Sequence, residues 1–234
     1  MYARQVADRT LTFGVSGMLY RDGLVMYDRQ TDTLWTQVDG RAVRGPLAGR
    51  QLELVPAVHA MWKEWLALYP RSQVLRKRGA FRSPYDDYNR DPRRLGITGR
   101  PNPDSRLPGK ERILGVRVGN AAMAFPVRTV RAARLAQAEV GGLPVILVAA
   151  GPNLPVLAYE RRAGSRELTF RLATDGGQSV LRDVETGSTW EIASGTATAG
   201  PMAGARLTRA TAYPAFWFGW RGYFPATRVW QPPG

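Results

Sequence analysis

Oxygen-rich side chains that could bind a cation gather in one stretch of the sequence, residues 83–92. Carboxylate and amide oxygens are the ligands that a hard cation such as Ca²⁺ prefers. The stretch lacks the glycine and the final glutamate of an EF-hand loop, so an ordinary turn-rich loop is the favoured interpretation. The candidate binding residues of this stretch are Tyr85, Asp86, Asp87 and Tyr88.

A second candidate binding group combines a carboxylate, a guanidinium and an indole. Its members are Asp28, Arg29 and Trp35. Asp28 has a counterpart, Asp183, at the equivalent place of an internal repeat described below. A residue present in both copies of a repeat is either a turn-former or a ligand-binder. Turn formation is the favoured interpretation, because an Asp at the start of a turn accepts backbone hydrogen bonds.

Two further groups suggest acid–base chemistry without supporting an assignment. Lys110 precedes Glu111, and neighbouring charges of this kind are mostly exposed ion pairs. His59 lies near the start of an expected helix, and its counterpart in the repeat is Pro214. A lone histidine without a matched partner is more often a surface residue than a base. We therefore predict no catalytic residue.

The residue types that are missing exclude several classes of chemistry. The 234 residues include no cysteine and one histidine, so the chain has no disulfide, thiolate metal site, cysteine nucleophile or multi-histidine centre. Neither a phosphate-binding glycine loop followed by lysine nor a Gly-x-Ser-x-Gly nucleophile elbow is present. The sequence implies no cofactor and favours a protein that is not an enzyme.

The charge of the chain is strongly positive, because 33 Lys and Arg against 19 Asp and Glu give +14. Such a field attracts polyanions, which makes a basic nucleic-acid-binding protein one alternative. The arginines are spread through nearly every segment, so a solvated basic surface is favoured instead. Hydrophobic residues at 44%, with 25 Gly and 17 Pro, predict a folded, strand-rich chain. No run approaches the roughly 18 apolar residues that span a bilayer.

The sequence repeats itself at an offset of 155 residues. Between residues 45–74 and 200–229, eleven of thirty positions are identical, where composition alone would give about two. The same offset carries Asp28 to Asp183 and Trp35 to Trp190. We therefore expect two diverged copies of one module. The conserved pairs in the long block include Gly45 and Gly200, Leu52 and Leu207, Trp62 and Trp217, Trp65 and Trp220, Pro70 and Pro225, and Val74 and Val229.

Strands are predicted in the first part of each copy. Residues 9–15 alternate between apolar and polar side chains, as a half-buried strand does. Residues 24–27 and 33–38 predict a hairpin that turns through residues 28–32.

A helix with two tryptophans is expected to close each copy. Apolar spacing predicts it over residues 58–69, ending at Pro70, and a weaker counterpart over residues 215–224. Aromatic residues at helical spacing are more often core than ligand platform, so we expect Trp62 and Trp65 to be buried. Each copy is then expected to end on a short strand, near Val74 in the first and Val229 in the second.

The segment between the copies predicts a loop and a further group of elements. Residues 76–110 have no period and predict a long loop. A hairpin over 113–118 and 122–125, a helical stretch over 128–140 and an apolar strand over 143–150 follow. The expected fold is α+β, mainly antiparallel β, with two pseudo-equivalent modules, each closed by its helix and packed as one body. The expected division is 1–75 (first module), 76–112 (long loop), 113–140 (hairpin and short helix) and 141–234 (second module).

Several blocks taken together resemble the domain of unknown function 3179 family. The resemblance covers nearly the whole chain. It implies that members usually carry an apolar strand and a Cys-Pro-x-Cys segment ahead of the strand that here begins at Met1. It also implies that many follow a signal, lipoprotein or membrane anchor. The blocks are LTFGVSGML at 11–19, MYDRQT at 26–31, LW at 34–35, GPLAG at 45–49, KERILGV at 110–116, AFWFGW at 215–220 and YFP at 223–225.

The chain departs from this family pattern at its front. The second copy has residues 150–154 where the cysteines would fall, and the first copy lacks the corresponding strand. A strand missing from a duplicated sheet would leave an open edge. We therefore expect that the start of the chain has been assigned too late.

Three classes of function are open at this point. The favoured hypothesis is a non-catalytic binding or structural module of an extracytoplasmic bacterial or archaeal protein, a compartment that only the resemblance implies. The first alternative is a redox or metal-handling protein, for copper or zinc, whose paired cysteines lie in the missing front segment. The second alternative is the basic nucleic-acid-binding protein. The sequence identifies no partner.

Overall fold

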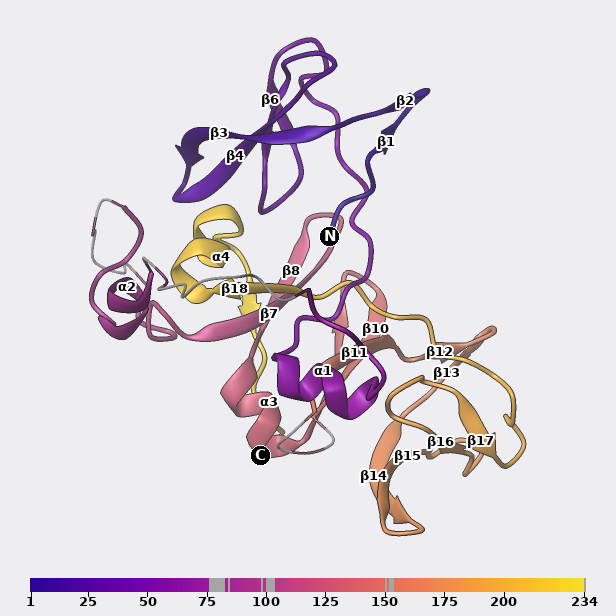
Figure 1. Cartoon of the computed structure of the whole chain (residues 1–234). Helices are drawn as coiled ribbons and strands as arrows, with labels where there is room; N and C mark the ends of the chain where they lie inside the picture. The colour runs from indigo at the N-terminus through magenta and orange to yellow at the C-terminus, as the bar shows by residue number, and fades with distance from the viewer. Residues whose placement is uncertain are drawn as a thin grey trace.

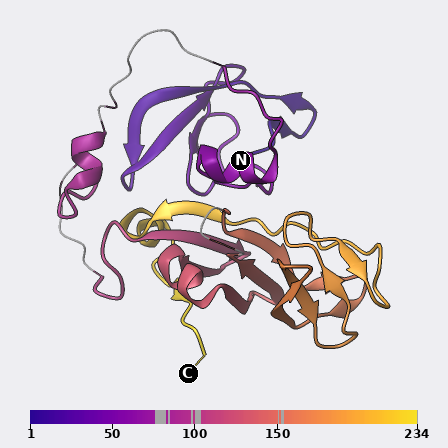
Figure 2. The same ribbon diagram turned by 60° about the horizontal axis from the view of Figure 1, so that its bottom comes forward.

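Mostly antiparallel strands and four short helices make up the part of the chain that the structure describes. The computed structural model describes residues 1–75, 83, 85–97, 99, 104–149, 151 and 154–233. Two four-stranded sheets, one near each end of the chain, lie apart in both views (Figure 1 and Figure 2). The prediction of a β-rich, mainly antiparallel chain is confirmed.

The N-terminal sheet forms because alternating residues turn one face onto a small core. Its strands pair in chain order, and Met26 lies opposite Trp35 in the predicted hairpin, which is confirmed. Leu11, Trp35, Ala42 and Leu52 are buried together beneath it. A two-stranded ribbon, β1 (Gln5–Val6) and β2 (Arg9–Thr10), precedes the sheet, whose strands are β3 (Phe13–Tyr20), β4 (Gly23–Asp28), β5 (Leu34–Thr36) and β6 (Ala42–Arg44).

The central part of the chain contains the predicted hairpin and the predicted apolar strand. The hairpin is β7 (Arg112–Val118) with β8 (Ala121–Pro126), and it leads into helix α3 (Val127–Ala133). A three-stranded sheet follows, in the order β11-β10-β9. Its strands are β9 (Leu135–Val140), β10 (Leu143–Val148) and β11 (Leu157–Glu160).

The predicted helical stretch over 128–140 is wrong in its second half. Helix α3 ends at Ala133 because Arg134 takes a left-handed conformation, with φ 64°. Residues 135–140 then form β9, which pairs antiparallel with β10 along its whole length. Strand pairing therefore overrides the local helical spacing.

The C-terminal sheet repeats the strand order of the N-terminal sheet. Its four strands also pair antiparallel in chain order, and Leu181 lies opposite Trp190. Phe170, Leu181 and Trp190 are buried in one core cluster with Ile146 and Tyr159. A ribbon of β12 (Arg162–Ala163) and β13 (Arg166–Glu167) precedes β14 (Phe170–Asp175), β15 (Gln178–Asp183), β16 (Thr189–Trp190) and β17 (Ala197–Ala199).

The last segment of the chain returns to the β7–β8 hairpin and covers it. Strand β18 (Tyr213–Phe216) pairs antiparallel with β7, and β19 (Arg228–Val229) pairs parallel with β8. Helix α4 (Trp217–Tyr223) lies between these two strands in the chain, and its two tryptophans are 0% and 1% exposed. The predicted second helix and the predicted strand at Val229 are both present.

The corresponding helix of the first half has a different environment. Helix α1 (Trp62–Leu68) is present within the predicted range, but Trp62 is 45% exposed and Trp65 is 37% exposed. The prediction that these two residues lie in the core is wrong, and α1 does not close the first half of the chain as α4 closes the second. No described strand covers α1 in the way that β7 and β8 cover α4.

The strand expected at Val74 and the loop expected over 76–110 also differ from the structure. No strand forms at Val74, since no described strand offers the parallel edge that β8 offers to Val229. The predicted loop over 76–110 contains one short helix, α2 (Asp86–Arg90). Residues 76–82, 84, 98 and 100–103 of that loop lie outside the described residues. Among the described helices, none has the length and apolar character to cross a membrane.

Candidate functional site

Asp28, the first predicted site residue, lies at the end of β4 and is fully buried. Its carboxylate accepts a 2.9 Å hydrogen bond from the indole nitrogen of Trp35 and a 2.7 Å bond from the backbone nitrogen of Thr31. Burial by itself raises the pKa of the Asp28 carboxyl, but the bonds from Trp35 and Thr31 outweigh it and hold that pKa below its ordinary value. The carboxylate is therefore charged and fixes the turn onto the core tryptophan.

The same arrangement occurs at Asp183 in the C-terminal sheet. Its carboxylate accepts bonds of 2.8 Å from Trp190 and 2.6 Å from the backbone nitrogen of Thr186. The hydroxyl of Thr186 lies 2.7 Å from that of Ser188, as the hydroxyl of Thr31 lies 2.7 Å from that of Thr33 in the first turn. Burial again raises the Asp183 pKa, and the hydrogen bonds again lower it below the ordinary value.

Arg29 does not join the carboxylate and the indole in this turn. Its side chain is exposed, and the guanidinium carbon lies 5.5 Å from the centre of the Tyr27 ring. Of the predicted group, the structure thus brings together Asp28 and Trp35. Because both carboxylate oxygens of Asp28 accept bonds from this turn, the turn-forming interpretation accounts for its contacts.

The tyrosine- and aspartate-bearing stretch lies on helix α2 and beside its ends. Asp87 pairs with Arg90 at 2.5 Å on an exposed face. The ammonium of Lys110 lies 3.7 Å from the centre of the Tyr88 ring and donates a 2.6 Å hydrogen bond to the carbonyl of Asp91. Lys110 thus ties this stretch to the start of β7. Tyr85 and Asp86 are exposed, and the described residues contain no group of three acidic or histidine side chains that could hold a metal.

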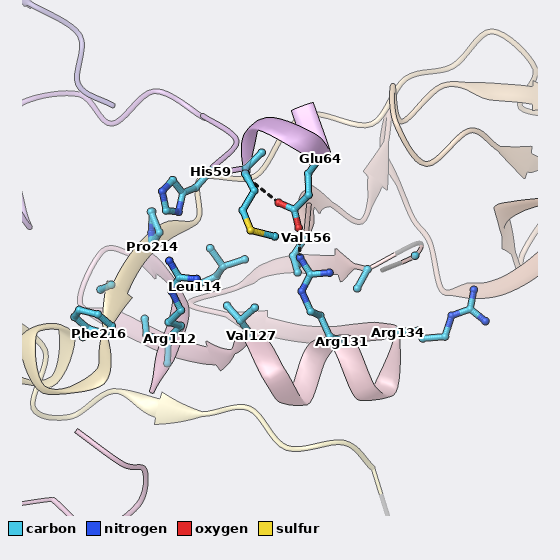
Figure 3. Close-up of a pocket in the computed structure, with 16 residues that line it drawn as sticks. His59, Glu64, Arg112, Leu114, Val127, Arg131, Arg134, Val156, Pro214 and Phe216 are labelled. Atoms are coloured by element: carbon cyan, nitrogen blue, oxygen red, sulfur yellow. Dashed lines mark hydrogen bonds and ion pairs between the residues drawn. The ribbon is translucent and has the colours of Figure 1, made fainter. Parts of the chain in front are cut away.

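A cavity of about 880 Å³ lies between the segment before α1 and the central strands. Figure 3 shows side chains from the α1 segment above it and from β7 and α3 below it. The floor is apolar and includes Ile113, Leu114, Val127 and Val156. Cavities of this size and apolar character are the usual form of small-molecule sites. The cavity is therefore the strongest candidate for a functional site.

One buried ion pair fixes the position of α1 over this cavity. Glu64 is 3% exposed, and its carboxylate lies 2.6 Å from the guanidinium of Arg131 on α3. The other oxygen of Glu64 accepts a 2.8 Å bond from the backbone nitrogen of Met61. Arg131 also donates a 3.2 Å bond to the carbonyl of Leu154. Helices α1 and α3 are thereby held at one separation, and the charge of Arg131 is balanced.

The other ionisable side chains among the described lining residues are His59, Arg112 and Arg134. Arg112 and His59 are exposed at the rim of the cavity, and the side chain of Arg112 makes no hydrogen bond or ion pair with another described residue. Arg134 points away from the other labelled side chains in Figure 3, and it donates a 3.1 Å bond to Ser179. Among the described lining residues, Arg112 is thus the exposed guanidinium at the rim that has no side-chain partner.

The cavity was not predicted from the sequence, although two of its lining residues, His59 and Pro214, were compared there as repeat counterparts. Arg112 was not predicted as a site residue, and it lies far from His59 in the chain. The signal that could have linked them is the repeat. Positions 59–61 and 214–216, which the sequence offset of 155 residues relates, all line the cavity, so these two segments face one space.

The described residues form a β-rich, mainly antiparallel protein with a ligand-sized cavity between the α1 segment, the β7 and β18 strands and helix α3. The model of a family described as protein of unknown function (DUF3179) matches residues 1–227, and the chain belongs to that family. No curated protein and no solved structure matches the chain.

Proposed function

We propose that this protein is a non-catalytic binding module that holds a small amphipathic anion in the cavity between α1, α3 and β7. The observation that carries the proposal is the combination of an apolar floor with Arg112 at the rim, whose side chain has no ion-pair partner among the described residues. An anionic head group such as a carboxylate would pair with the guanidinium, and an alkyl or ring body would lie on the floor. Guanidinium groups suit such oxyanions because they donate two parallel hydrogen bonds.

The ion pair between Glu64 and Arg131 supports this orientation. Since Glu64 neutralises Arg131 inside the cavity, the unbalanced positive charge lies at the rim rather than at the floor. A ligand therefore gains most when its charge stays near water and its apolar part enters. The cavity offers no reactive pair of groups that would require the ligand to be transformed, so we propose binding as its role.

The two-module organisation is part of the same proposal. The matching carboxylate–indole bonds at Asp28 and Asp183 support a duplication, as does the equal strand order of the two sheets. Tyr2 and Tyr159 also donate equivalent hydrogen bonds, to the carbonyls of Val38 and Ala193. We propose modules over 1–75 and 141–234, with the loop 76–112 and the segment 113–140 between them.

Calorimetric titration with octanoate and with octan-1-ol tests the binding proposal. The two ligands share an alkyl chain, so a preference for octanoate isolates the contribution of the charge. We expect Arg112→Gln to weaken octanoate binding by about tenfold, the effect of losing one charge-assisted contact, and to leave octanol binding unchanged. The matched control is Arg171→Gln, an exposed arginine on β14 that does not line the cavity.

Two results would overturn the proposal. Equal affinity for acid and alcohol would show that the rim cation has no role. Octanoate binding that Arg112→Gln and Arg171→Gln weaken equally would place the anion on the general basic surface, which would instead favour the polyanion-binding alternative.

A further inference from the structure

We propose that the ligand of the cavity is a phosphate monoester with an apolar body, and that His59 and Arg112 bind its phosphate together. This inference rests on the proposed binding of an anion beside Arg112 and names the chemical class of that anion. His59 and Arg112 both line the cavity, and both side chains are exposed at its rim. In Figure 3 they lie at the same end of the cavity, beside Pro214 and away from Arg131. The two basic groups are thus placed to meet one head group.

The acidic residues near this end of the cavity are both engaged elsewhere. Glu64, the one acidic residue among the described lining residues, is 3% exposed, and its carboxylate lies 2.6 Å from the guanidinium of Arg131. Glu111 precedes Arg112 in the chain but does not line the cavity, and its carboxylate lies 4.0 Å from the guanidinium of Arg128. Adjacent residues of an extended chain point to opposite faces, which separates Glu111 from Arg112. A dianionic head group therefore meets two basic side chains without a carboxylate beside them.

A phosphate monoester matches this pair of basic side chains better than a carboxylate does. The guanidinium fork of Arg112 binds two oxygens of an oxyanion. A carboxylate then offers His59 only an oxygen that is already bonded. A phosphate monoester keeps a third terminal oxygen and carries about two negative charges near pH 7. The imidazole has an N–H that can donate to this oxygen in either protonation state.

The rest of the cavity accommodates the apolar body of the ester. From the end that carries His59, the apolar floor runs through Leu114 and Val127 toward Val156 (Figure 3). The phosphate would stay at the rim, and the chain attached to its ester oxygen would lie along this floor. Each methylene that is buried there strengthens binding by about fourfold, so the body contributes much of the affinity.

Calorimetric titration at pH 7 with octyl phosphate, octanoate and inorganic phosphate tests this inference. We expect octyl phosphate to bind about tenfold more tightly than octanoate, because its third terminal oxygen accepts a charge-assisted hydrogen bond from His59. His59→Ala should remove this advantage and change octanoate binding by less than about twofold, since octanoate bonds mainly to Arg112. Inorganic phosphate should bind at least about 100-fold more weakly than octyl phosphate, because it buries no apolar surface.

A second readout follows His59 directly and needs no variant. The chain contains one histidine, so the NMR resonances of its imidazole are unambiguous. They should shift on addition of octyl phosphate and shift much less on addition of octanoate. The matched control is Lys63→Gln, which removes an exposed cation of α1 that does not line the cavity. This variant should leave both affinities unchanged.

The outcomes separate this inference from the proposed function on which it rests. Octanoate binding that depends on Arg112, with octyl phosphate no tighter and no shift of the His59 resonances, would overturn the phosphate assignment and leave the binding module standing. Absence of binding by either amphiphile would overturn both. Weakening of octyl phosphate binding to the same extent by Lys63→Gln and His59→Ala would assign the preference to the general positive charge. Inorganic phosphate that binds as tightly as octyl phosphate would show that the apolar floor has no role.

Discussion

At the scale of single residues, two buried aspartates stabilise their turns, and their lowered pKa values reflect the hydrogen bonds that their carboxylates accept. Asp28 and Asp183 are 0% and 1% exposed, yet each is held in the charged form by donors from its own turn and from a tryptophan. A buried charge is costly unless its lone pairs are satisfied. The turn-forming role was favoured from the sequence because both copies carry Asp and Thr at the same spacing.

We expect Asp28→Asn to lower the free energy of unfolding by about 2 kcal/mol at pH 7, because the amide loses charge-assisted bonds to Trp35 and Thr31. The folded-state pKa of Asp28 is lower than its ordinary value of 3.8. The stabilisation by the carboxylate is therefore present above about pH 4 and is lost as the pH falls through the lower, folded-state pKa. Urea unfolding at pH 7 and at pH 3 checks this.

The matched control for Asp28→Asn is Asp32→Asn, which changes an exposed side chain in the same turn. Its effect should be small and independent of pH. A deficit of Asp28→Asn that is as large at pH 3 as at pH 7 would contradict the ionic origin of the stabilisation.

At the scale of elements, α1 and α4 show what sequence pattern can and cannot predict. Both helices were predicted from apolar spacing, and α1 ends shortly before Pro70 as expected. Burial of their tryptophans was not predictable, because it depends on whether a hairpin distant in sequence packs over them. The strand at Val229 forms by pairing with β8, whereas Val74 has no such pairing among the described residues. The local pattern is the same and the tertiary partner differs.

Equivalent substitutions in the two helices should therefore have unequal effects on stability. We expect Trp220→Ala to destabilise the protein by about 3–5 kcal/mol, the usual cost of removing a fully buried large aromatic side chain. Trp65→Ala, at the equivalent but partly exposed position, should cost about 1 kcal/mol or less. Thermal and urea unfolding of both variants give the comparison, and equal losses would contradict the difference in packing.

At the scale of the whole molecule, contacts between distant segments create the features that carry function. The hydroxyl of Tyr223 on α4 donates a 2.6 Å bond to the carbonyl of Tyr20 at the tip of β3, and Arg21 donates a 3.1 Å bond to the carbonyl of Gly222. These bonds join the N-terminal sheet to the helix of the second half. The ion pair between Glu64 and Arg131 joins the two halves again beside the cavity.

Because the cavity is formed by contacts between distant segments, it could not be predicted from the sequence. Composition and periodicity predict strands, turns and helices, and the repeat relates the two copies. The cavity depends on how segments 59–61, 112–114 and 214–216 meet in space, which no local pattern determines. His59 was therefore interpreted as a lone surface residue, and Arg112 was not singled out, although both lie at one rim of the cavity.

The chain contains two similar helix–turn units, one at α1 and one at α4. The β7–β8 hairpin covers the tryptophans of α4, whereas those of α1 are partly exposed. Oxidative footprinting of individual tryptophans by mass spectrometry, on the folded protein, tests this difference most directly. The account predicts rapid oxidation of Trp62 and Trp65 and slow oxidation of Trp217 and Trp220. Equal protection of all four side chains would contradict it, because the α1 face would then be covered in the free protein.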